Sequence, residues 1–416
     1  MILILRKSIV FLLIIAIRID AISAQYDPYD LPCYDFLNYQ QNKLDLPNDS
    51  SNFKNFFSNI NTLILKGEGQ INVVHIGDSH LQADYFSGEM RQRMQTFFQG
   101  GLGGRGFIFP YALAKTNNPY TFSVKYTGNW ESCRNIERKK QCSLGLSGVS
   151  VTTYDSVSTI SIFLRTKDYP KYDFNKVKIF HTLNNSFTVE IDSCANKRVV
   201  FNNDSLGYTY FLLDDYIDTL HLKITKTDST QTSFTLHGIS LETNDPGIIY
   251  HSIGVNGAEV NSFLRCDLFS RHLEALSPDF VIVSLGTNDA YPKKFNEDRF
   301  IQNYDTLINN IKLAVPDAAI LLTVPADSYR MRKYPNTNTE IARNAIYKIA
   351  TSHQCAVWDL YDIMGGFQSI NKWNQNGFTA SDKLHFSKSG YILQGDLLFT
   401  AFLKSYDEYI EKYITK

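Results

Sequence analysis

Short apolar runs alternate with helix-length segments at the front and in the second half of the chain. Residues 71–76 have the pattern of a buried strand that ends at Gly77, and helical spacing of apolar residues follows at 85–98. The same alternation returns later, with strands predicted at 280–285, 319–324 and 356–359 and helices at 301–313, 339–351 and 389–413. Strands that alternate with helices of this length predict a parallel sheet covered by helices on both faces.

The pattern between residues 111 and 243 is different. Apolar and polar residues alternate there in short runs, at 159–164, 176–180, 186–191, 219–224 and 233–236. Turn-forming Asn, Asp, Ser and Gly residues separate these runs, which is typical of an antiparallel β-sandwich or jelly roll. We therefore predict that an antiparallel module is inserted into an α/β domain.

These patterns divide the chain into five segments. They are a signal peptide (1–24), an N-terminal lead-in with one helix near 53–65 (25–69), the first part of the α/β domain (70–110), the inserted β-sandwich (111–243) and the second part of the α/β domain (244–416).

The first segment has the three parts of an export signal. Arg6 and Lys7 precede an apolar stretch at 8–17, and small residues follow at 21–24. An uncleaved membrane anchor is the alternative, although the apolar run is short for a bilayer span. We expect the mature protein to be exported to the periplasm or the extracellular space.

Charge and cysteine content narrow the functional classes. The net charge of −1 over 416 residues does not suggest a nucleic-acid partner. The six cysteines, Cys33, Cys133, Cys142, Cys194, Cys266 and Cys355, contain no C-x-x-C pair, which gives zinc or redox chemistry little support. We expect no metal and no other cofactor. An exported chain allows a disulfide between Cys133 and Cys142 across a hairpin, and six free thiols are the alternative.

Ser79 stands where the first predicted strand meets a helix, within the sequence Gly-Asp-Ser-His. Ligands of parallel sheets bind at the carboxyl ends of strands, and a helix N-terminus favours developing negative charge. A serine hydroxyl at this place is a candidate nucleophile if a base removes its proton. A simple helix cap is the alternative interpretation.

Asp382 and His385 supply a candidate base near the end of the chain. Histidine is the usual general base near neutral pH, and a carboxylate holds its tautomer and stabilises its charged form. The spacing of three lets one turn carry both groups, although an ordinary surface turn has the same pattern.

Two further short motifs offer hydrogen-bond donors. Asn288 directly follows the strand at 280–285, where its amide is able to donate to an oxyanion. Gly257 lies in the sequence Gly-Val-Asn-Gly-Ala, and a glycine brings its backbone N–H close to a substrate without a clashing Cβ. Taken singly, each motif is also an ordinary turn.

Together these four motifs resemble the SGNH (GDSL-like) hydrolase superfamily in type and in order. The resemblance covers roughly residues 70–106 and 246–412. It implies a flavodoxin-like, three-layer α/β/α domain and a serine esterase. In this family pattern Ser79 is the nucleophile, Asp382 and His385 complete the triad, and Ser79, Gly257 and Asn288 form the oxyanion hole.

The inserted sandwich and the GDSH form of the first motif resemble the peptidoglycan O-acetylesterases within this superfamily. This narrower resemblance implies removal of O-acyl groups, acetyl above all, from a polysaccharide such as peptidoglycan. Transfer of the acyl group to a sugar hydroxyl by the same triad is one alternative. A glycan-binding protein on a degenerate hydrolase scaffold is another. The residues that bind the glycan and the oligomeric state are not assigned.

Other chemistry-bearing residues are expected to be structural. The glycine-rich stretch 100–106 follows a helix, so we interpret it as a loop beside the cleft in which Arg105 has a structural role more readily than a substrate contact. His75, His237 and His251 are interpreted as structural, and His80 is placed near the cleft without a role.

Overall fold

The computed structural model describes residues 29–48, 50–165, 170–183, 186–191, 197–230 and 232–414. The predicted export signal and Cys194 lie outside these residues. Residues 34–416 form one unit and residues 1–33 belong to another. Within the described segments, no helix is long and apolar enough to cross a bilayer.

Five parallel strands form the central sheet of the α/β domain. Their order across the sheet is β13 (Gly247–Gly254), β1 (Gln70–Gly77), β14 (Phe280–Ser284), β15 (Ala319–Val324) and β18 (Ala356–Asp359). In chain order this is 2-1-3-4-5, the flavodoxin-like order, in which ligands bind where the strand order reverses at the first strand. The predicted fold is therefore confirmed.

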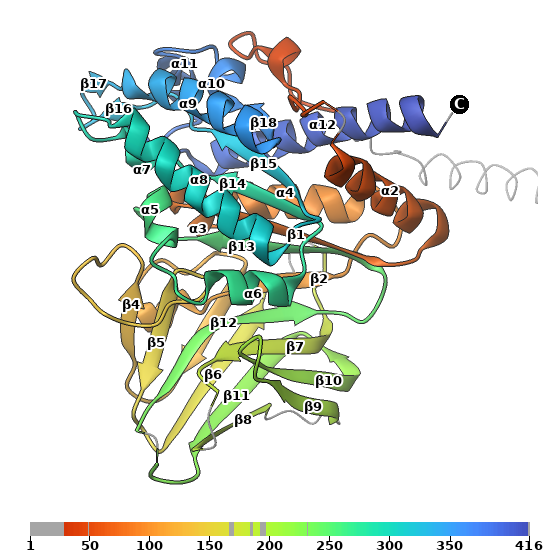
Figure 1. The fold of residues 1–416 in the computed structure, drawn as a ribbon, viewed down its shortest axis with the longest axis vertical. Coiled ribbons are helices and arrows are strands. Elements are labelled where there is room, and N and C mark those ends of the chain that lie inside the picture. Colours follow the sequence, from red (N-terminus) through yellow and green to blue (C-terminus); the bar gives the residue numbers. More distant parts are fainter. Residues whose placement is uncertain are drawn as a thin grey trace, which may run out of the picture. The chain divides into compact units, whose positions relative to one another are not determined.

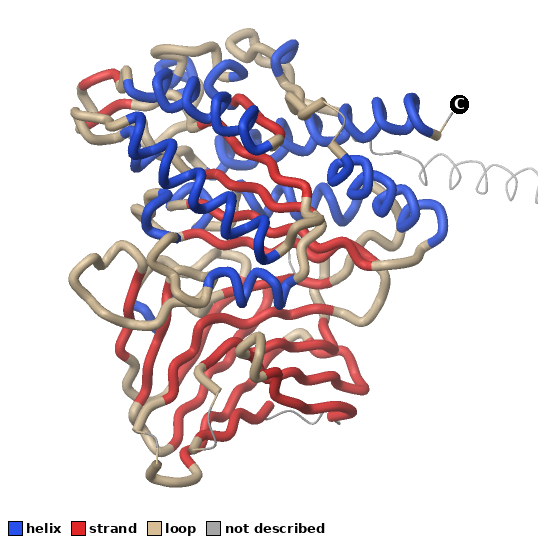
Figure 2. Tube along the Cα trace, viewed as in Figure 1, coloured by secondary structure: helices blue, strands red, loops and turns tan. Residues whose placement is uncertain are grey.

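Helices cover both faces of this sheet, as Figures 1 and 2 show. One layer contains α5 (Val260–Phe263), α6 (Phe269–Leu276), α8 (Glu297–Ala314) and α9 (Asn338–His353), and the other contains α2 (Ser51–Lys66), α4 (Phe86–Thr96) and α12 (Lys388–Tyr413). Strands β14 and β15 between them are apolar along nearly their whole length because both of their faces are buried, and β1 is buried from Val73 onward. The short helices are α3 (Ser79–Gln82), α7 (Thr287–Ala290), α10 (Leu360–Ile363) and α11 (Ile370–Gln375).

The lead-in contributes helix α2 to one of these two helical layers. Helix α2 begins after Ser50, whose side chain accepts the N–H of Phe53, and it ends at Gly67 in the left-handed conformation. Its apolar face is buried, and the ring of Phe56 stacks on that of Phe280 in β14 at 4.6 Å between centroids. Helix α2 thus packs against the central sheet as part of the α/β domain.

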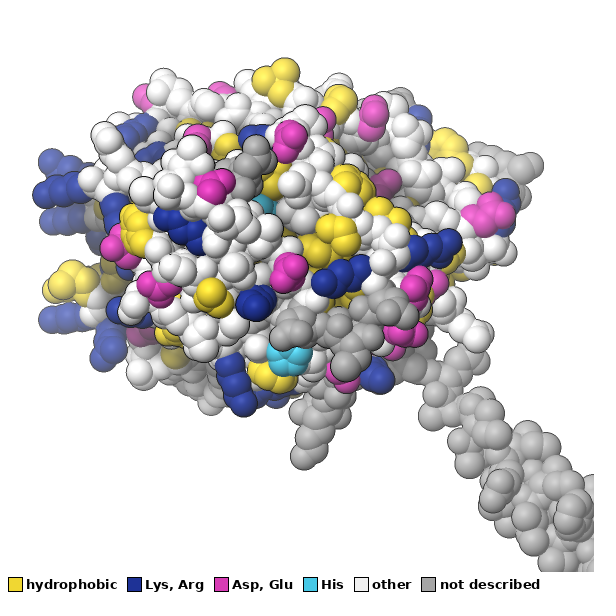
Figure 3. Space-filling model, turned by 90° about the horizontal axis from the view of Figure 1, so that it is seen from below, with side chains coloured by type: hydrophobic (Ala, Val, Ile, Leu, Met, Phe, Trp, Pro, Cys, Tyr) yellow, Lys and Arg dark blue, Asp and Glu magenta, His cyan; other side chains and the backbone are white. Residues whose placement is uncertain are grey.

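The module consists of two antiparallel sheets. One contains, in order, β4 (Glu131–Arg134), β5 (Val149–Thr153), β12 (Phe234–Glu242), β7 (Phe174–His181), β10 (Tyr208–Ile217) and β9 (Lys197–Asn203). The other contains β3 (Phe122–Tyr126), β6 (Val157–Leu164), β11 (Thr219–Lys226) and β8 (Phe187–Ile191). Alternate residues of both sheets are buried in one core. From below, Figure 3 shows hydrophobic side chains singly or in small groups among charged and polar ones, as expected outside a buried core.

The glycine-rich stretch differs from its prediction. Residues Gly104–Ile108 form strand β2, which pairs with β12 and so joins the first sheet of the module. Gly106 has φ +77, and a Cβ there would lie 2.5 Å from the backbone oxygen of Tyr250. The glycines are needed for this close passage between module and sheet, whereas in the sequence they indicate a loop.

Arg105 is buried at this junction together with Asp84. The carboxylate of Asp84 accepts two hydrogen bonds from Arg91 of α4, at 3.0 and 2.9 Å, and one from Arg105 at 2.6 Å. It also accepts hydroxyl hydrogen bonds from Ser87 and from Thr121, which precedes β3. Burial alone would raise the pKa of Asp84, but the two guanidinium groups hold it well below its ordinary value. Asp84 therefore links the segment that follows Ser79 to the module.

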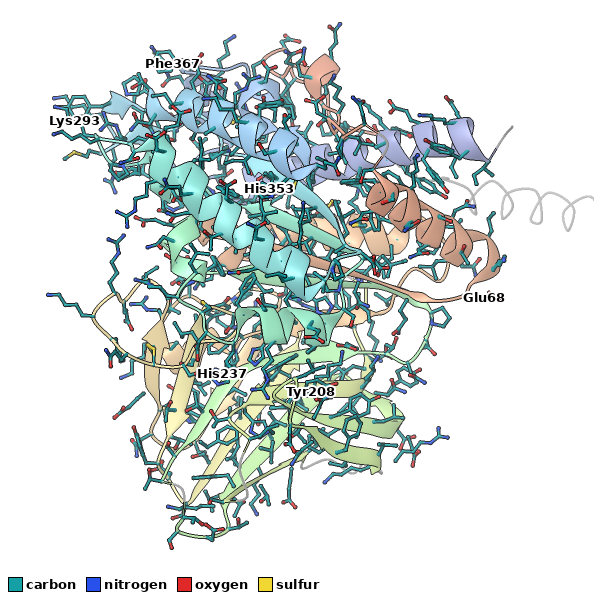
Figure 4. All side chains as sticks on the ribbon, viewed as in Figure 1. Glu68, Tyr208, His237, Lys293, His353 and Phe367 are labelled. Carbon is teal, nitrogen blue, oxygen red and sulfur yellow. A yellow bond between two sulfur atoms is a disulfide. The ribbon has the colours of Figure 1, made fainter. Side chains whose placement is uncertain are left out.

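Histidines also lie buried along the junction. The rings of His237 in β12 (labelled in Figure 4) and His272 in α6 are 5.6 Å apart. His251 accepts the N–H of Phe107 in β2, and His75 bonds to Tyr250 and Ser284. Burial lowers the pKa of His75, His237 and His251 to between about 3 and about 4, so these rings are neutral packing groups.

One hairpin of the module is closed by a disulfide. Cys133 in β4 is bonded to Cys142, whereas Cys266 and Cys355 are buried thiols and Cys33 is an exposed one. The predicted link across this hairpin is therefore present.

We expect Asp84→Asn to destabilise the protein strongly. Removing one partner of a buried ion pair leaves uncompensated charges and costs about 3–5 kcal/mol. The free energy of unfolding in urea at neutral pH measures this loss. Lys348→Gln, which breaks the exposed pair of Lys348 with Glu297, is the matched control and should cost less than about 1 kcal/mol. Equal small losses for both variants would contradict a role of Asp84 as the anchor of the junction.

Candidate active site

Ser79 lies at the first turn after β1, at the carboxyl edge of the sheet. Asp78 caps helix α3, and its side chain accepts the N–H of His80 at 3.0 Å. Gly254 at the end of β13 lets this turn pack closely, because a Cβ there would lie 2.3 Å from the backbone nitrogen of Gln82. The helix that follows the Gly-Asp-Ser turn therefore packs directly against Gly254, the first residue of the later glycine motif.

Ser79 and His385 are brought together from opposite ends of the sequence. The Oγ of Ser79 is 3.1 Å from Nε2 of His385, and Nδ1 of His385 is 2.8 Å from Oδ2 of Asp382. A hydroxyl, an imidazole and a carboxylate therefore form one chain of hydrogen bonds. This is the arrangement in which a histidine removes a serine proton and a carboxylate orients the ring.

The carboxylate of this chain is held by its own turn. Oδ1 of Asp382 accepts the backbone N–H groups of Leu384 and His385, both at 3.0 Å. Burial alone would raise the pKa of Asp382, but the hydrogen bonds from His385 and from these N–H groups hold it below its ordinary value. Asp382 is therefore ionised at neutral pH and remains in place to orient the imidazole.

A cavity of about 680 Å³ opens beside these groups, and Ser79, Gly257, Asn288 and His385 all line it. Gly257 has φ +80 with open space around it, which only glycine adopts without strain. Neither the N–H of Ser79 nor that of Gly257 has an acceptor among the described residues. Both N–H groups are therefore available to an oxygen atom placed in the cavity.

Asn288 lies in the cavity wall, but its amide is already engaged. Nδ2 of Asn288 donates to Oδ2 of Asp78 and to the backbone oxygen of Ala258, both at 3.0 Å. An oxyanion would have to share or displace one of these acceptors. The sequence motif indicates the donor and gives no sign of this competition.

Asp78 is a completely buried carboxyl next to Ser79. Burial raises its pKa to about 7, although hydrogen bonds from the His80 N–H and Asn288 and the nearby His385 oppose this rise. Asp289 in α7 is similar, because burial raises its pKa to about 7 while the N–H of Val260 opposes the rise. Two buried carboxyl groups, next in sequence to Ser79 and to Asn288, therefore have pKa values near neutral pH.

His80 lines the cavity next to the imidazole of the base. Its ring lies 5.5 Å from that of His385, and its Nδ1 is hydrogen-bonded to the hydroxyl of Tyr391 at 3.0 Å. Burial, together with the nearby His385, lowers the pKa of His80 to about 3. The ring is therefore neutral at neutral pH.

Gln82 is a site residue that the sequence gives no motif for. Its Nε2 donates to Thr116 Oγ1 at 3.2 Å and to the backbone oxygen of Asn117 at 2.8 Å, and its Oε1 accepts the N–H of Asn256 at 2.7 Å. One buried amide thereby fixes the loop that enters the module and the glycine motif beside the helix of the nucleophile. Such a role depends on three partners that are remote in sequence.

Comparison with known proteins finds a family model that matches part of this chain. The model of the GDSL-like lipase/acylhydrolase family matches residues 228–393, a stretch that contains Gly257, Asn288, Asp382 and His385. Ser79 precedes this stretch because the module separates it from the other motifs. Residues 228–393 therefore match the GDSL-like lipase/acylhydrolase family, which supports the resemblance of the α/β domain to the SGNH hydrolases.

The two-part architecture is also found in a solved structure of a peptidoglycan O-acetylesterase. That structure has a TM-score of 0.68 and 20% identity, and the match covers 90% of this chain and 99% of that one. The acetyl xylan esterase AlAXEase (TM-score 0.30, 21% identity) matches over 38% of this chain and 81% of its own. A GDSL-like lipase from Bacteroides thetaiotaomicron (TM-score 0.29, 20% identity) matches over 39% and 76%. No curated protein matches the chain.

The raised pKa of Asp78 predicts a pH-dependent stability that Asp78→Asn removes. Between about 3.9, the pKa of an unfolded Asp, and about 7, the native state holds a proton that the unfolded chain has released. The free energy of unfolding therefore falls as pH rises through this window, by at most about 1.4 kcal/mol per pH unit from this group. Asp78→Asn should gain stability relative to wild type from about pH 5 to about pH 7 in urea unfolding. Asp289 is present in both proteins, and a difference that is constant over this range would contradict the prediction.

Proposed function

We propose that this chain is an exported serine esterase that removes O-acyl groups, chiefly acetyl, from a polysaccharide such as peptidoglycan. The observation that carries the proposal is the chain of hydrogen bonds from Ser79 through His385 to Asp382 at the wall of an open cavity. The fold shared with a peptidoglycan O-acetylesterase supports an O-acetylated polysaccharide as the substrate.

In the first half of the reaction Ser79 Oγ attacks the ester carbonyl carbon while Nε2 of His385 takes the hydroxyl proton. The negative charge that develops on the carbonyl oxygen is stabilised by the N–H groups of Ser79 and Gly257, and by Asn288 when its amide turns from Asp78. The intermediate then expels the sugar oxygen, which receives the proton from His385, and the acyl group remains on Ser79.

The second half repeats these steps with water as the nucleophile. His385 removes a proton from the water molecule that attacks the acyl-enzyme, and then returns it to Ser79 Oγ as the carboxylic acid leaves. Asp382 stays ionised throughout and stabilises the charged imidazole. A sugar hydroxyl in the place of water would give acyl transfer instead.

Export is supported by two features. Residues 1–24 have the basic, apolar and small-residue parts of a signal peptide. The disulfide between Cys133 and Cys142 is typical of proteins that fold in an oxidising compartment.

Ser79→Ala, His385→Ala and Asp382→Asn should each lower the turnover of p-nitrophenyl acetate and the release of acetate from an O-acetylated glycan by about 10⁴-fold or more. Circular dichroism spectra like that of the wild type would show that the variants are folded. If Ser79→Ala kept wild-type turnover, the proposed mechanism would be wrong.

Asn288→Ala should lower kcat by about 100- to 1,000-fold on the same substrates, because it removes one donor to the oxyanion. The expected effect is on kcat rather than KM, since the amide bonds to protein acceptors until the charge develops. A kcat that is unchanged would show that the engaged amide never leaves Asp78 and Ala258.

A further inference from the structure

A pair of stacked tyrosines stands at the edge of the active-site cavity. Tyr85 lines the cavity, and the ring of Tyr120 stacks on it with 4.1 Å between centroids and 20° between planes. Tyr85 comes from the hydrolase segment just before α4, whereas Tyr120 belongs to the module, just before β3. The two parts of the chain therefore build this wall together.

A lysine lies beside this pair. The Nζ of Lys388, the first residue of α12, is 5.9 Å from the ring centroid of Tyr85 and 5.4 Å from that of Tyr120. Since the two rings are only 4.1 Å apart, these nearly equal distances place the ammonium group at the side of the stack, not beyond one of its outer faces. Lys388 is exposed, and no carboxylate of the described residues pairs with it. The ammonium group of Lys388 therefore has no carboxylate partner among the described residues.

Two asparagines complete the wall. Asn117 and Asn256 both line the cavity, and their side-chain amides have no hydrogen-bond partner among the described residues. Their backbones are fixed by Gln82, which binds the oxygen of Asn117 and the N–H of Asn256. Each amide offers donors and an acceptor from a backbone that is already held in place.

We propose that Tyr85, Tyr120, Lys388, Asn117 and Asn256 form a subsite for a sugar ring that carries a carboxylate. The aromatic side chains provide an apolar surface for the ring, the two amides match sugar hydroxyl groups, and the ammonium pairs with the carboxylate. This inference rests on the proposed esterase function and narrows its substrate to an acidic glycan. The module is then part of the substrate site, through Asn117 and Tyr120.

Steady-state kinetics at low ionic strength test whether the positive charge of Lys388 contributes to substrate binding. Lys388→Gln should raise KM about tenfold for O-acetylated peptidoglycan fragments or for O-acetylated pectin oligosaccharides, with kcat changed less than about twofold. The two acidic substrates separate a carboxylate on a glycan substituent from one on the sugar ring. For acetylated xylooligosaccharides without uronic acid and for p-nitrophenyl acetate, the KM of Lys388→Gln should stay within about twofold of the wild-type value. Lys388→Arg keeps the positive charge and should restore most of the affinity for the acidic substrates. Lys412→Gln, at the exposed far end of α12, is the matched control.

The aromatic pair is tested on both kinds of glycan. Tyr85→Ala should raise KM for acidic and neutral oligosaccharides alike, whereas Tyr85→Phe keeps the stack and should resemble wild type. An unchanged KM of Lys388→Gln on both acidic glycans, or an equal rise on the neutral one, would overturn the proposed subsite.

Binding separates this inference from the esterase proposal. Calorimetric titration of the Ser79→Ala variant with the same oligosaccharides requires no turnover, and Lys388→Gln in that background should weaken binding of an acidic oligosaccharide about tenfold. Acidic-glycan binding that depends on Lys388 in a protein without ester turnover would support the subsite and refute the esterase. Turnover of p-nitrophenyl acetate, together with acidic-glycan binding that does not depend on Lys388, would support the esterase and refute the subsite.

Discussion

The parallel pairing of β1 with β13 is the constraint on which the site depends. Its register sets Gly77 opposite Gly254, so the Gly-Asp-Ser turn and the Gly257 segment leave the sheet side by side. The whole module lies in the connection between these two strands. Loop-closure entropy grows only with the logarithm of length, at ~0.6 kcal/mol for each doubling, so the insertion is tolerated if both of its ends remain near the sheet. The Asp84 cluster and strand β2 hold the first end there, and the pairing of β12 with β2 holds the second.

Burial and competing hydrogen bonds set the charge states of the carboxyl groups near Ser79. Asp382 is ionised because its turn supplies N–H donors, whereas the buried Asp78 titrates near neutral pH. The amide of Asn288 bonds to Asp78, and Asn288 also lines the cavity into which an oxyanion would project. A neutral Asp78 holds that amide less strongly than an ionised one, because hydrogen bonds to a charged acceptor are the stronger ones. The charge of Asp78 therefore affects how readily Asn288 is released.

Local features of the structure could be predicted from the sequence. The apolar runs at 71–76 and 280–285 become β1 and β14, and the residues that follow them reach the sheet edge that the strand order defines. Asp382 and His385 are three residues apart, so their contact requires only one turn. The alternating runs of the module likewise become the strands of its two sheets.

Features that depend on remote partners could not be predicted. Gly104, Arg105 and Gly106 suggest a loop, and only the passage of this segment between β12 and β13 makes it a strand. Asp84 and Gln82 are ordinary polar residues in the sequence, because their roles depend on Arg105, Thr121, Asn117 and Asn256. The engagement of the Asn288 amide by Asp78 also joins two segments that are far apart in the chain.

The division into a catalytic domain and an inserted module is therefore clearer in the sequence than in the folded protein. The loop that enters the module carries Asn117 into the lining of the cavity and Tyr120 onto the ring of Tyr85, and Gln82 holds this loop against the helix of Ser79. A module tied so closely to the helix of Ser79 cannot move freely without disturbing the contact between Ser79 and His385. Its sheets can vary on the side remote from the junction, but the segment around residues 116–121 is constrained by the same contacts that position the reacting groups.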